Sequence, residues 1–238
     1  MQPETRTWRP QAFGPRKPKE LSNPIVEPAW DGVRILAHAG PEGVQLIDAE
    51  GVDLAAAHPE IAEELAGVTR DEALVIDGYL TDQALRSGIG VDFDIDQTPG
   101  LGEHMTQFFL GQKAADAMAG RGQIPGRATA RTVGQAEASA AAAAAEQVPI
   151  AFVAVDLLVL DQDDLRDVPL LERKRLLESV LPEGPRVRRT TFVREPAGSF
   201  IITWRALGFG GLAYKEANSR YHPGAVNEDW SLIPMPRR

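Results

Sequence analysis

The chain has 238 residues, 43% of them hydrophobic, which suffices for one well-buried domain. No run of about eighteen apolar residues occurs and the N-terminus lacks an apolar signal segment, so the sequence predicts neither a membrane span nor a secretory signal. The chain has no cysteine, which excludes disulfides, thiolate zinc sites and a catalytic thiol, and we expect a cytoplasmic protein.

The charge of the chain bears on the choice of partner. The formal net charge is −9, whereas proteins dedicated to nucleic acid are usually basic because phosphate contacts need Lys and Arg. Basic residues gather near the N-terminus and again at 186–194, where they either contact phosphate or form solvated surface. Binding of DNA is therefore expected to be weak, and we favour a protein as the partner.

The first part of the chain is predicted to begin loosely and to continue as short strands. Residues 1–20 are polar and rich in Pro and Arg, which predicts a flexible basic arm. A helix is predicted at 54–68, because Ile61, Leu65 and Val68 recur at helical spacing. Strands are predicted at 25–30, 33–39, 44–49 and 73–81.

The character of the sequence changes between about residues 85 and 147. This segment contains an acidic loop, a stretch rich in Gly and Arg, and an alanine-rich run that favours helix. A compact domain needs no such segment, so it is predicted to be an insertion or an elaborated connection, serving either as a docking element or as a variable surface excursion.

The remaining elements complete a mixed domain. A strand is predicted at 150–160, apolar except for Asp156, followed by a helix at 168–181. Further short elements are predicted at 200–207, 211–217 and 229–234. Strands and helices alternate without a regular β-α-β repeat, which favours an α+β fold with antiparallel sheets.

Six motifs follow one another in an order that carries more weight than any of them alone. They are EPAWDGVR at 27–34, LIDAEG at 46–51, VIDGYL at 75–80, FVAVDLLVL at 152–160, GFGGLAYKE at 208–216 and EDWSLIP at 228–234. The set resembles the adenylation domain of ATP-dependent DNA ligases, especially the short, repair-associated bacterial type. The resemblance implies a ligase-type, ATP-grasp-like nucleotidyltransferase domain at 21–238, made of antiparallel sheets flanked by helices, without an OB-fold domain.

The first motif lacks the residue on which the chemistry of that family depends. The family attacks the α-phosphate of ATP with a lysine of this motif, and the resemblance assigns that position to Ala29. A methyl group is not a nucleophile, so self-adenylation by the family route is not expected. The other characteristic positions of the motif are retained, namely Glu27, Asp31, Gly32 and Arg34.

The later motifs also lack residues to which the family gives a role in binding nucleotide or metal. Tyr79 stands where the family has a glutamate for ribose or metal, and Val155 replaces the aromatic residue that stacks on adenine. The family's final motif offers lysines to the triphosphate, whereas this chain has Leu232 and Pro234. Two further polar positions are also lost, at Ala49 and Gly210.

The residues that remain define a candidate remnant of a nucleotide pocket. Lys215 is either an exposed lysine at a strand end or part of a former phosphate site, and it is the one lysine expected near the pocket. The histidines show no ligand spacing, so no metal site is expected. The candidate positions are Glu27, Asp31, Gly32, Arg34, Asp77, Tyr79, Val155 and Lys215, some of which turns and packing alone would explain.

Three functions are compatible with these patterns. The resemblance with its losses favours a pseudoenzyme, a non-catalytic binding scaffold in DNA repair that needs no cofactor. An alternative is an active ATP-dependent DNA ligase or nucleotidyltransferase with a relocated nucleophile, which would use ATP and magnesium. A third is a module that binds nucleotide without reacting. The sequence does not indicate the oligomeric state.

Overall fold

The computed structural model describes residues 3–69, 73–84 and 149–236. The segment predicted as an insertion, at about 85–147, lies outside these residues. None of the described helices is both long and apolar enough to span a membrane.

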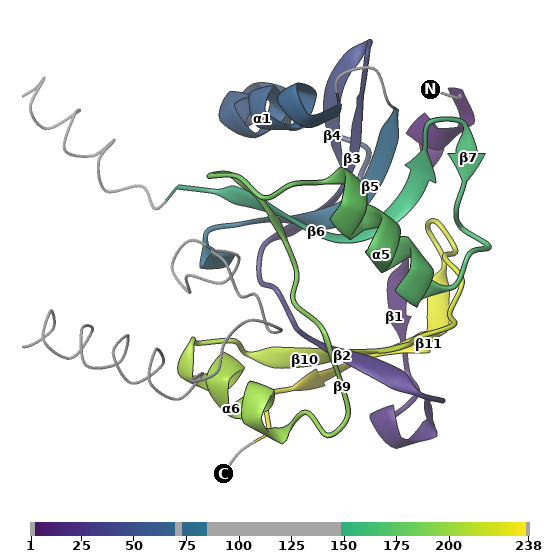
Figure 1. Cartoon of the computed structure of the whole chain (residues 1–238), viewed down its shortest axis with the longest axis vertical. Helices are drawn as coiled ribbons and strands as arrows, with labels where there is room; N and C mark the ends of the chain where they lie inside the picture. The colour runs from purple at the N-terminus through teal and green to yellow at the C-terminus, as the bar shows by residue number, and fades with distance from the viewer. Residues whose placement is uncertain (1–2, 70–72, 85–148, 237–238) are drawn as a thin grey trace, which may run out of the picture. The chain divides into compact units, whose positions relative to one another are not determined.

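Two sheets form the described part of the chain (Figure 1). The first sheet has the strand order β1-β11-β10-β2-β9, and the second has the order β4-β3-β5-β6-β7 with β8 added against β6. The strands of the first sheet are β1 (Ala12–Gly14), β2 (Pro24–Pro28), β9 (Val193–Arg194), β10 (Gly211–Glu216) and β11 (Val226–Pro234). Those of the second are β3 (Val33–Gly40), β4 (Gly43–Asp48), β5 (Leu74–Thr81), β6 (Ala151–Leu160), β7 (Asp163–Asp164) and β8 (Val187–Arg189).

The described ranges contain three α-helices, α1, α5 and α6, and the positions of these helices follow from their apolar faces. Figure 1 shows α1 (Pro59–Thr69) beside β3 and β4, and α6 (Gly198–Ala206) beside the first sheet. Trp204 of α6 packs in one apolar cluster with Val26 and Leu212 of that sheet. The part of the chain that the structure describes also contains short 3-10 helices at Pro3–Thr7, Pro18–Glu20 and Ala55–Ala57.

Helix α5 (Leu170–Val180) contributes both apolar and charged side chains to the interior. It begins after Pro169, and its residues Leu170 and Leu177 enter the core. Arg173 and Lys174 on the same helix are also buried, at 0% and 4% exposure. Burial of two cationic residues on one helix requires acceptors inside the protein, which are Asp156 for Arg173 and Glu27 for Lys174.

The predicted α+β class is confirmed, with one difference in the pairing of strands. Most neighbouring strands are antiparallel as expected, but β1 pairs with β11 and β6 pairs with β8 in parallel. The helix expected at 54–68 is divided, because a 3-10 turn occupies Ala55–Ala57 and the α-helix starts at Pro59. Proline suits the first turn of a helix and not its interior.

The N-terminal segment differs from the flexible arm expected of it. Strand β1 joins the first sheet, and the Gln11 side chain is 1% exposed. The Gln11 side-chain oxygen accepts hydrogen bonds from the backbone N–H of His222 at 2.7 Å and from Asn227 at 3.2 Å. Trp8 lies under the Arg166 guanidinium, 4.1 Å from the ring centre. Contacts with distant residues therefore hold a segment whose local composition favours disorder.

Candidate functional site

One face of the first sheet carries several of the positions that the family resemblance assigns to nucleotide chemistry. Side chains two apart along a strand share a face, and the register aligns β2, β10 and β11. The face therefore consists of three rows, each with one residue from each strand. The inner row is Ile25, Lys215 and Trp230, the middle row is Glu27, Ala213 and Leu232, and the outer row is Ala29, Gly211 and Pro234.

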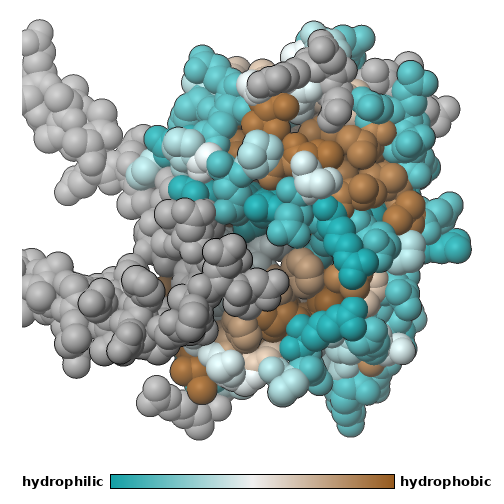
Figure 2. Space-filling view, in the orientation of Figure 1, coloured by the Kyte–Doolittle hydropathy of each residue, from teal (hydrophilic) through white to brown (hydrophobic). Residues whose placement is uncertain are grey.

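A cavity of about 390 Å³ lies over this face. Figure 2 shows apolar surface between α5 and β10, below a hydrophilic band. The cavity brings together Ala29 and most of the predicted remnant positions, namely Glu27, Asp31, Tyr79, Val155 and Lys215. Leu232, Pro234 and Gly210, three further positions at which the resemblance implies a lost polar residue, also line it, as does Phe13 from β1. Gly32, Arg34 and Asp77 lie elsewhere, and each has a structural explanation.

Gly32 is required by the backbone. Its φ is +119°, a conformation that side-chain-bearing residues rarely adopt. A Cβ atom there would lie 2.2 Å from the carbonyl oxygen of Leu80. Glycine at this position therefore serves the path of the chain next to the cavity.

Arg34 and Asp77 form a buried pair behind the cavity. The Arg34 guanidinium donates to the two carboxylate oxygens of Asp77 at 3.0 and 2.6 Å. The Tyr221 hydroxyl donates to the same carboxylate at 2.8 Å, and Arg34 also donates to the carbonyl of Gln11 at 2.6 Å. This network joins β3 and β5 to the loop between β10 and β11 and to the N-terminal segment, so these residues support the fold around the site.

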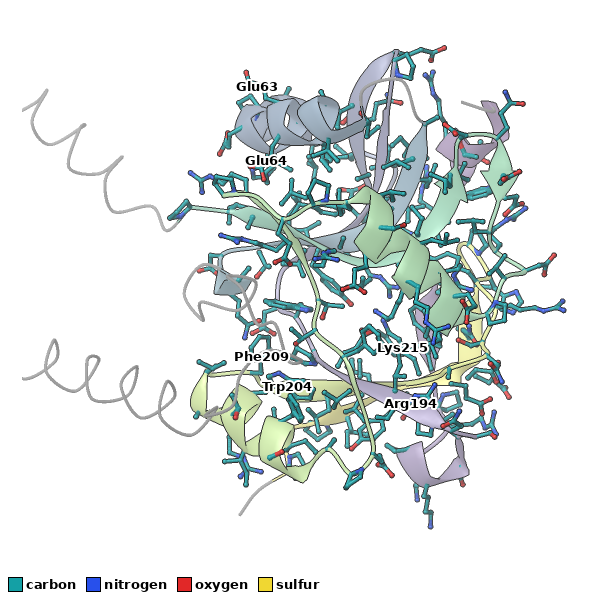
Figure 3. The ribbon with its side chains drawn as sticks, in the orientation of Figure 1. Glu63, Glu64, Arg194, Trp204, Phe209 and Lys215 are labelled. Carbon is teal, nitrogen blue, oxygen red and sulfur yellow. The ribbon has the colours of Figure 1, made fainter. Side chains whose placement is uncertain are left out.

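At the inner end of the cavity, one carboxylate serves two ammonium groups. Lys215 donates to Glu27 Oε2 at 2.7 Å, and Lys174 pairs with Glu27 Oε1. Lys174 also donates to the carbonyl of Val155 at 2.8 Å, and Lys215 lies 4.1 Å from the ring centre of Trp230. In Figure 3 the Lys215 side chain rises from β10. Lys215 is thus a buried, ion-paired residue of the cavity and not an exposed lysine.

The electrostatic environment of this cluster affects its members differently. Burial alone would raise the pKa of Glu27, but Lys174 and Lys215 outweigh it and hold that pKa below its ordinary value. Burial lowers the pKa of Lys215, and the charge of Lys174 acts in the same direction while Glu27 opposes them. Glu27 is therefore ionised, and the cluster carries one carboxylate against two amines.

Lys174 corrects the expectation that Lys215 alone would lie near the pocket. Lys174 lies on α5 and contacts Glu27 on β2, and the motifs did not predict that these two elements are neighbours. Its neighbour Arg173 donates to both oxygens of Asp156 at 2.8 and 2.7 Å, with both side chains fully buried. The sequence did contain a signal for this contact. Arg173 and Lys174 are adjacent on a helix whose buried face is otherwise apolar, and buried cations are rare unless acceptors lie inside the protein.

Several wall positions to which the resemblance assigns phosphate and base contacts carry apolar side chains. The outer and middle rows offer Ala29, Leu232 and Pro234, none of which can offset phosphate charge. Val155 gives no aromatic face for a base, and burial raises the pKa of Tyr79, so that side chain stays neutral. Within the described ranges, no three His, Asp or Glu side chains are grouped to hold a metal ion.

Sequence comparison identifies the relatives of this chain. The ATP dependent DNA ligase domain family matches residues 112–232, just over half of the chain. A probable DNA ligase of Streptomyces coelicolor is 27% identical over 219 residues, covering 90% of this chain and 35% of that protein. A probable DNA ligase of Kineococcus radiotolerans is 29% identical over 217 residues, covering 87% of this chain and 33% of that protein. The chain thus spans about a third of the length of these relatives.

Comparison of structures agrees at the level of the fold. The ligase domain of LigD from M. tuberculosis has a TM-score of 0.58 with 21% identity, covering 96% of this chain and 60% of that one. A mycobacterial DNA ligase D complexed with ATP and MES has a TM-score of 0.57 with 20% identity, covering 95% of this chain and 60% of that one. The fold of this chain is that of a ligase nucleotidyltransferase domain, and by its sequence the chain belongs to the ATP-dependent DNA ligase domain family.

Proposed function

We propose that this chain is a ligase-type adenylation domain that has lost self-adenylation and acts as a non-catalytic binding scaffold. One observation supports the proposal: Ala29, to which the resemblance assigns the position of the family's nucleophile, lines the cavity beside Gly211. A nucleotidyl transfer that proceeds through a lysine adduct needs an amine there. The partner is proposed to be a protein, because the net charge of −9 disfavours DNA, and the setting is proposed to be DNA repair.

The alternative, an active enzyme with a relocated nucleophile, has one supporting observation. Lys215 lines the cavity, and burial lowers its pKa, as a nucleophilic amine requires. Its place on the strand argues against that role. Lys215 lies four residues along β10 from Gly211, the residue beside Ala29, which is about 13 Å at roughly 3.3 Å per residue. Its ammonium group is also held by Glu27.

A labelling assay separates the two functions. The full chain is incubated with α-labelled ATP and magnesium, denatured, and examined by gel and intact mass, beside a catalytically competent ATP-dependent DNA ligase. We expect no adenylate on this chain. A stable adduct that disappears in the Lys215→Ala variant would establish the relocated nucleophile and refute the scaffold.

The Ala29→Lys variant tests how far the loss extends. A new amine in the outer row meets neither the cations of the final motif nor the glutamate of the third, since Leu232, Pro234 and Tyr79 occupy those positions. We therefore expect no adduct from Ala29→Lys either. Adduct formation by this single variant would mean that the other replacements leave the chemistry intact.

A further inference from the structure

The cavity has one buried polar end, and its other walls are mostly apolar, although the exposed Asp31 and the Tyr79 side chain also line it. The polar end is the contact between Glu27 and Lys215, which are 1% and 2% exposed. The walls above it come from both sheets and from β1, and the side chains that form them include Phe13, Ala29, Trp30, Val155, Leu232 and Pro234. This cavity is mostly apolar and has one buried lysine at its polar end. It therefore differs from a phosphate-binding cavity, which is lined with several cations.

The charges at the polar end do not balance within the protein. Buried ion pairs elsewhere in the described structure are one to one, as between Arg34 and Asp77. Here Glu27 is shared by Lys174 and Lys215, and the other charge that acts on Lys215 is the cation Arg34. A buried cation without its own counterion is costly, and an anion in the cavity would remove that cost.

Lys215 also has hydrogen-bonding capacity left over. An ammonium group has three donors, and among the described residues Lys215 donates one hydrogen bond, to Glu27. Lys174 does not line the cavity and uses a second donor on the carbonyl of Val155. Lys215 is therefore the cation that a molecule in the cavity would meet.

We propose that the cavity binds a small-molecule carboxylate with an apolar body, whose carboxylate pairs with Lys215 and whose body lies against Leu232 and Val155. The inference rests on the proposed function, because a self-adenylating domain would hold a nucleotide in the same space. Within the buried cluster of Glu27, Lys174 and Lys215 the excess is one positive charge, which matches a monoanion, and the Asp31 carboxylate lies at an exposed wall position. A phosphate group would bring more charge, and the outer row offers no further cation to receive it.

The test uses octanoate, its neutral analogue octanamide, and ATP with magnesium as probes of the full chain. Binding is measured by calorimetry and by tryptophan fluorescence, since Trp30 lines the cavity and Trp230 contacts Lys215. We expect saturable binding of octanoate, and binding of octanamide weaker by on the order of tenfold or more, the value of a charge-assisted hydrogen bond. ATP is expected to bind more weakly than octanoate.

Two variants and a control locate the site. Lys215→Met removes the cation and leaves Glu27 paired with Lys174, so the protein should fold and lose its preference for octanoate over octanamide. Leu232→Glu places a repelling carboxylate on a wall residue that is 52% exposed, so it should abolish octanoate binding without entering the core. Ile202→Glu on α6, at a residue that is 60% exposed and does not line the cavity, should leave binding unchanged.

The outcomes separate this inference from the proposed function. Equal binding of octanoate and octanamide, tight binding of ATP instead of octanoate, or octanoate binding that survives Leu232→Glu would each overturn the carboxylate site. None of these would affect the scaffold, which falls only if an AMP adduct forms. The reverse also holds, because an adduct would refute the scaffold whatever octanoate does.

Discussion

The Glu27 carboxylate is the counterion of two buried amines, Lys174 and Lys215. Substitution of Glu27 should therefore lower the free energy of unfolding more than substitution of Lys215. Glu27→Gln would leave Lys174 and Lys215 without a counterion, and removing one partner of a buried pair costs about 3–5 kcal/mol. Lys215→Met instead leaves a balanced pair, so its free energy of unfolding should equal or exceed that of the parent. Denaturation in urea measures both variants. A larger loss for Lys215→Met than for Glu27→Gln would show that the charges are distributed otherwise.

His38 gives the stability a dependence on pH. It is 1% exposed, and neither ring nitrogen has a hydrogen-bond partner among the described residues. Burial, assisted by Arg6 and Arg9 and opposed by Asp53, lowers the pKa of His38 from 6.5 to about 4. Between pH 6.5 and pH 4, His38 is protonated in the unfolded chain but stays neutral in the folded protein. The free energy of unfolding is therefore not reduced by His38 above pH 6.5, and it falls by about 3 kcal/mol as the pH is lowered to 4.

The His38→Leu variant isolates this contribution from that of the carboxylates. The difference in free energy of unfolding between parent and variant, followed by chemical denaturation from pH 7 to pH 4, should shift in favour of the variant by about 3 kcal/mol. A difference that stays constant over this range would mean that His38 is charged in the folded protein.

At the same scale, the motifs locate some site residues and miss others for a physical reason. Ala29, Tyr79 and Val155 were assigned to one pocket by motif order, and the structure places all three on one cavity. Lys174 was not assigned there, since its ion pair with Glu27 joins residues far apart in the sequence. Hydrophobic periodicity reports which side of a helix is buried, but not which acceptor a buried cation meets.

Among the elements, the N-terminal segment should contribute measurably to stability. Gln11→Ala removes the acceptor of His222 and Asn227 inside the protein, so we expect a loss of about 1–3 kcal/mol. Lys19→Ala, on the exposed part of the same segment, should change the stability by less than about 0.5 kcal/mol. Thermal and urea unfolding compare the two. Equal effects would mean that the segment is bound no more tightly at Gln11 than at its surface.

The elements also show where prediction from local sequence ends. The strands at β2 to β6 were predicted within a few residues, because alternation and turn residues are local signals. The N-terminal segment was predicted to be flexible from its local composition. That prediction failed because the segment is ordered by contacts with residues beyond position 220, which composition does not reveal. Trp8 and Phe13 were the available hint, since aromatic residues are scarce in disordered segments.

For the whole molecule, the net charge of −9 predicts weak association with DNA. Fluorescence anisotropy with a nicked duplex at physiological salt should give a Kd no tighter than about 1 µM, the range of non-specific binding. An otherwise identical unnicked duplex serves as the control and should bind equally. A nanomolar Kd that requires the nick would contradict the proposal of a protein partner.

The pairing of β2 with β10 has a consequence for the synthesis of the protein. Strands β3, β4 and β5 can pair with one another soon after they leave the ribosome, because they are neighbours in the chain. Strand β2 precedes them, yet its partners are β9 and β10, so its apolar residues Ile25 and Val26 stay unpaired until those later strands are made. The cavity therefore cannot form until β10 and β11 are made, and a polypeptide halted before β9 would leave β2 unpaired and accessible to chaperones.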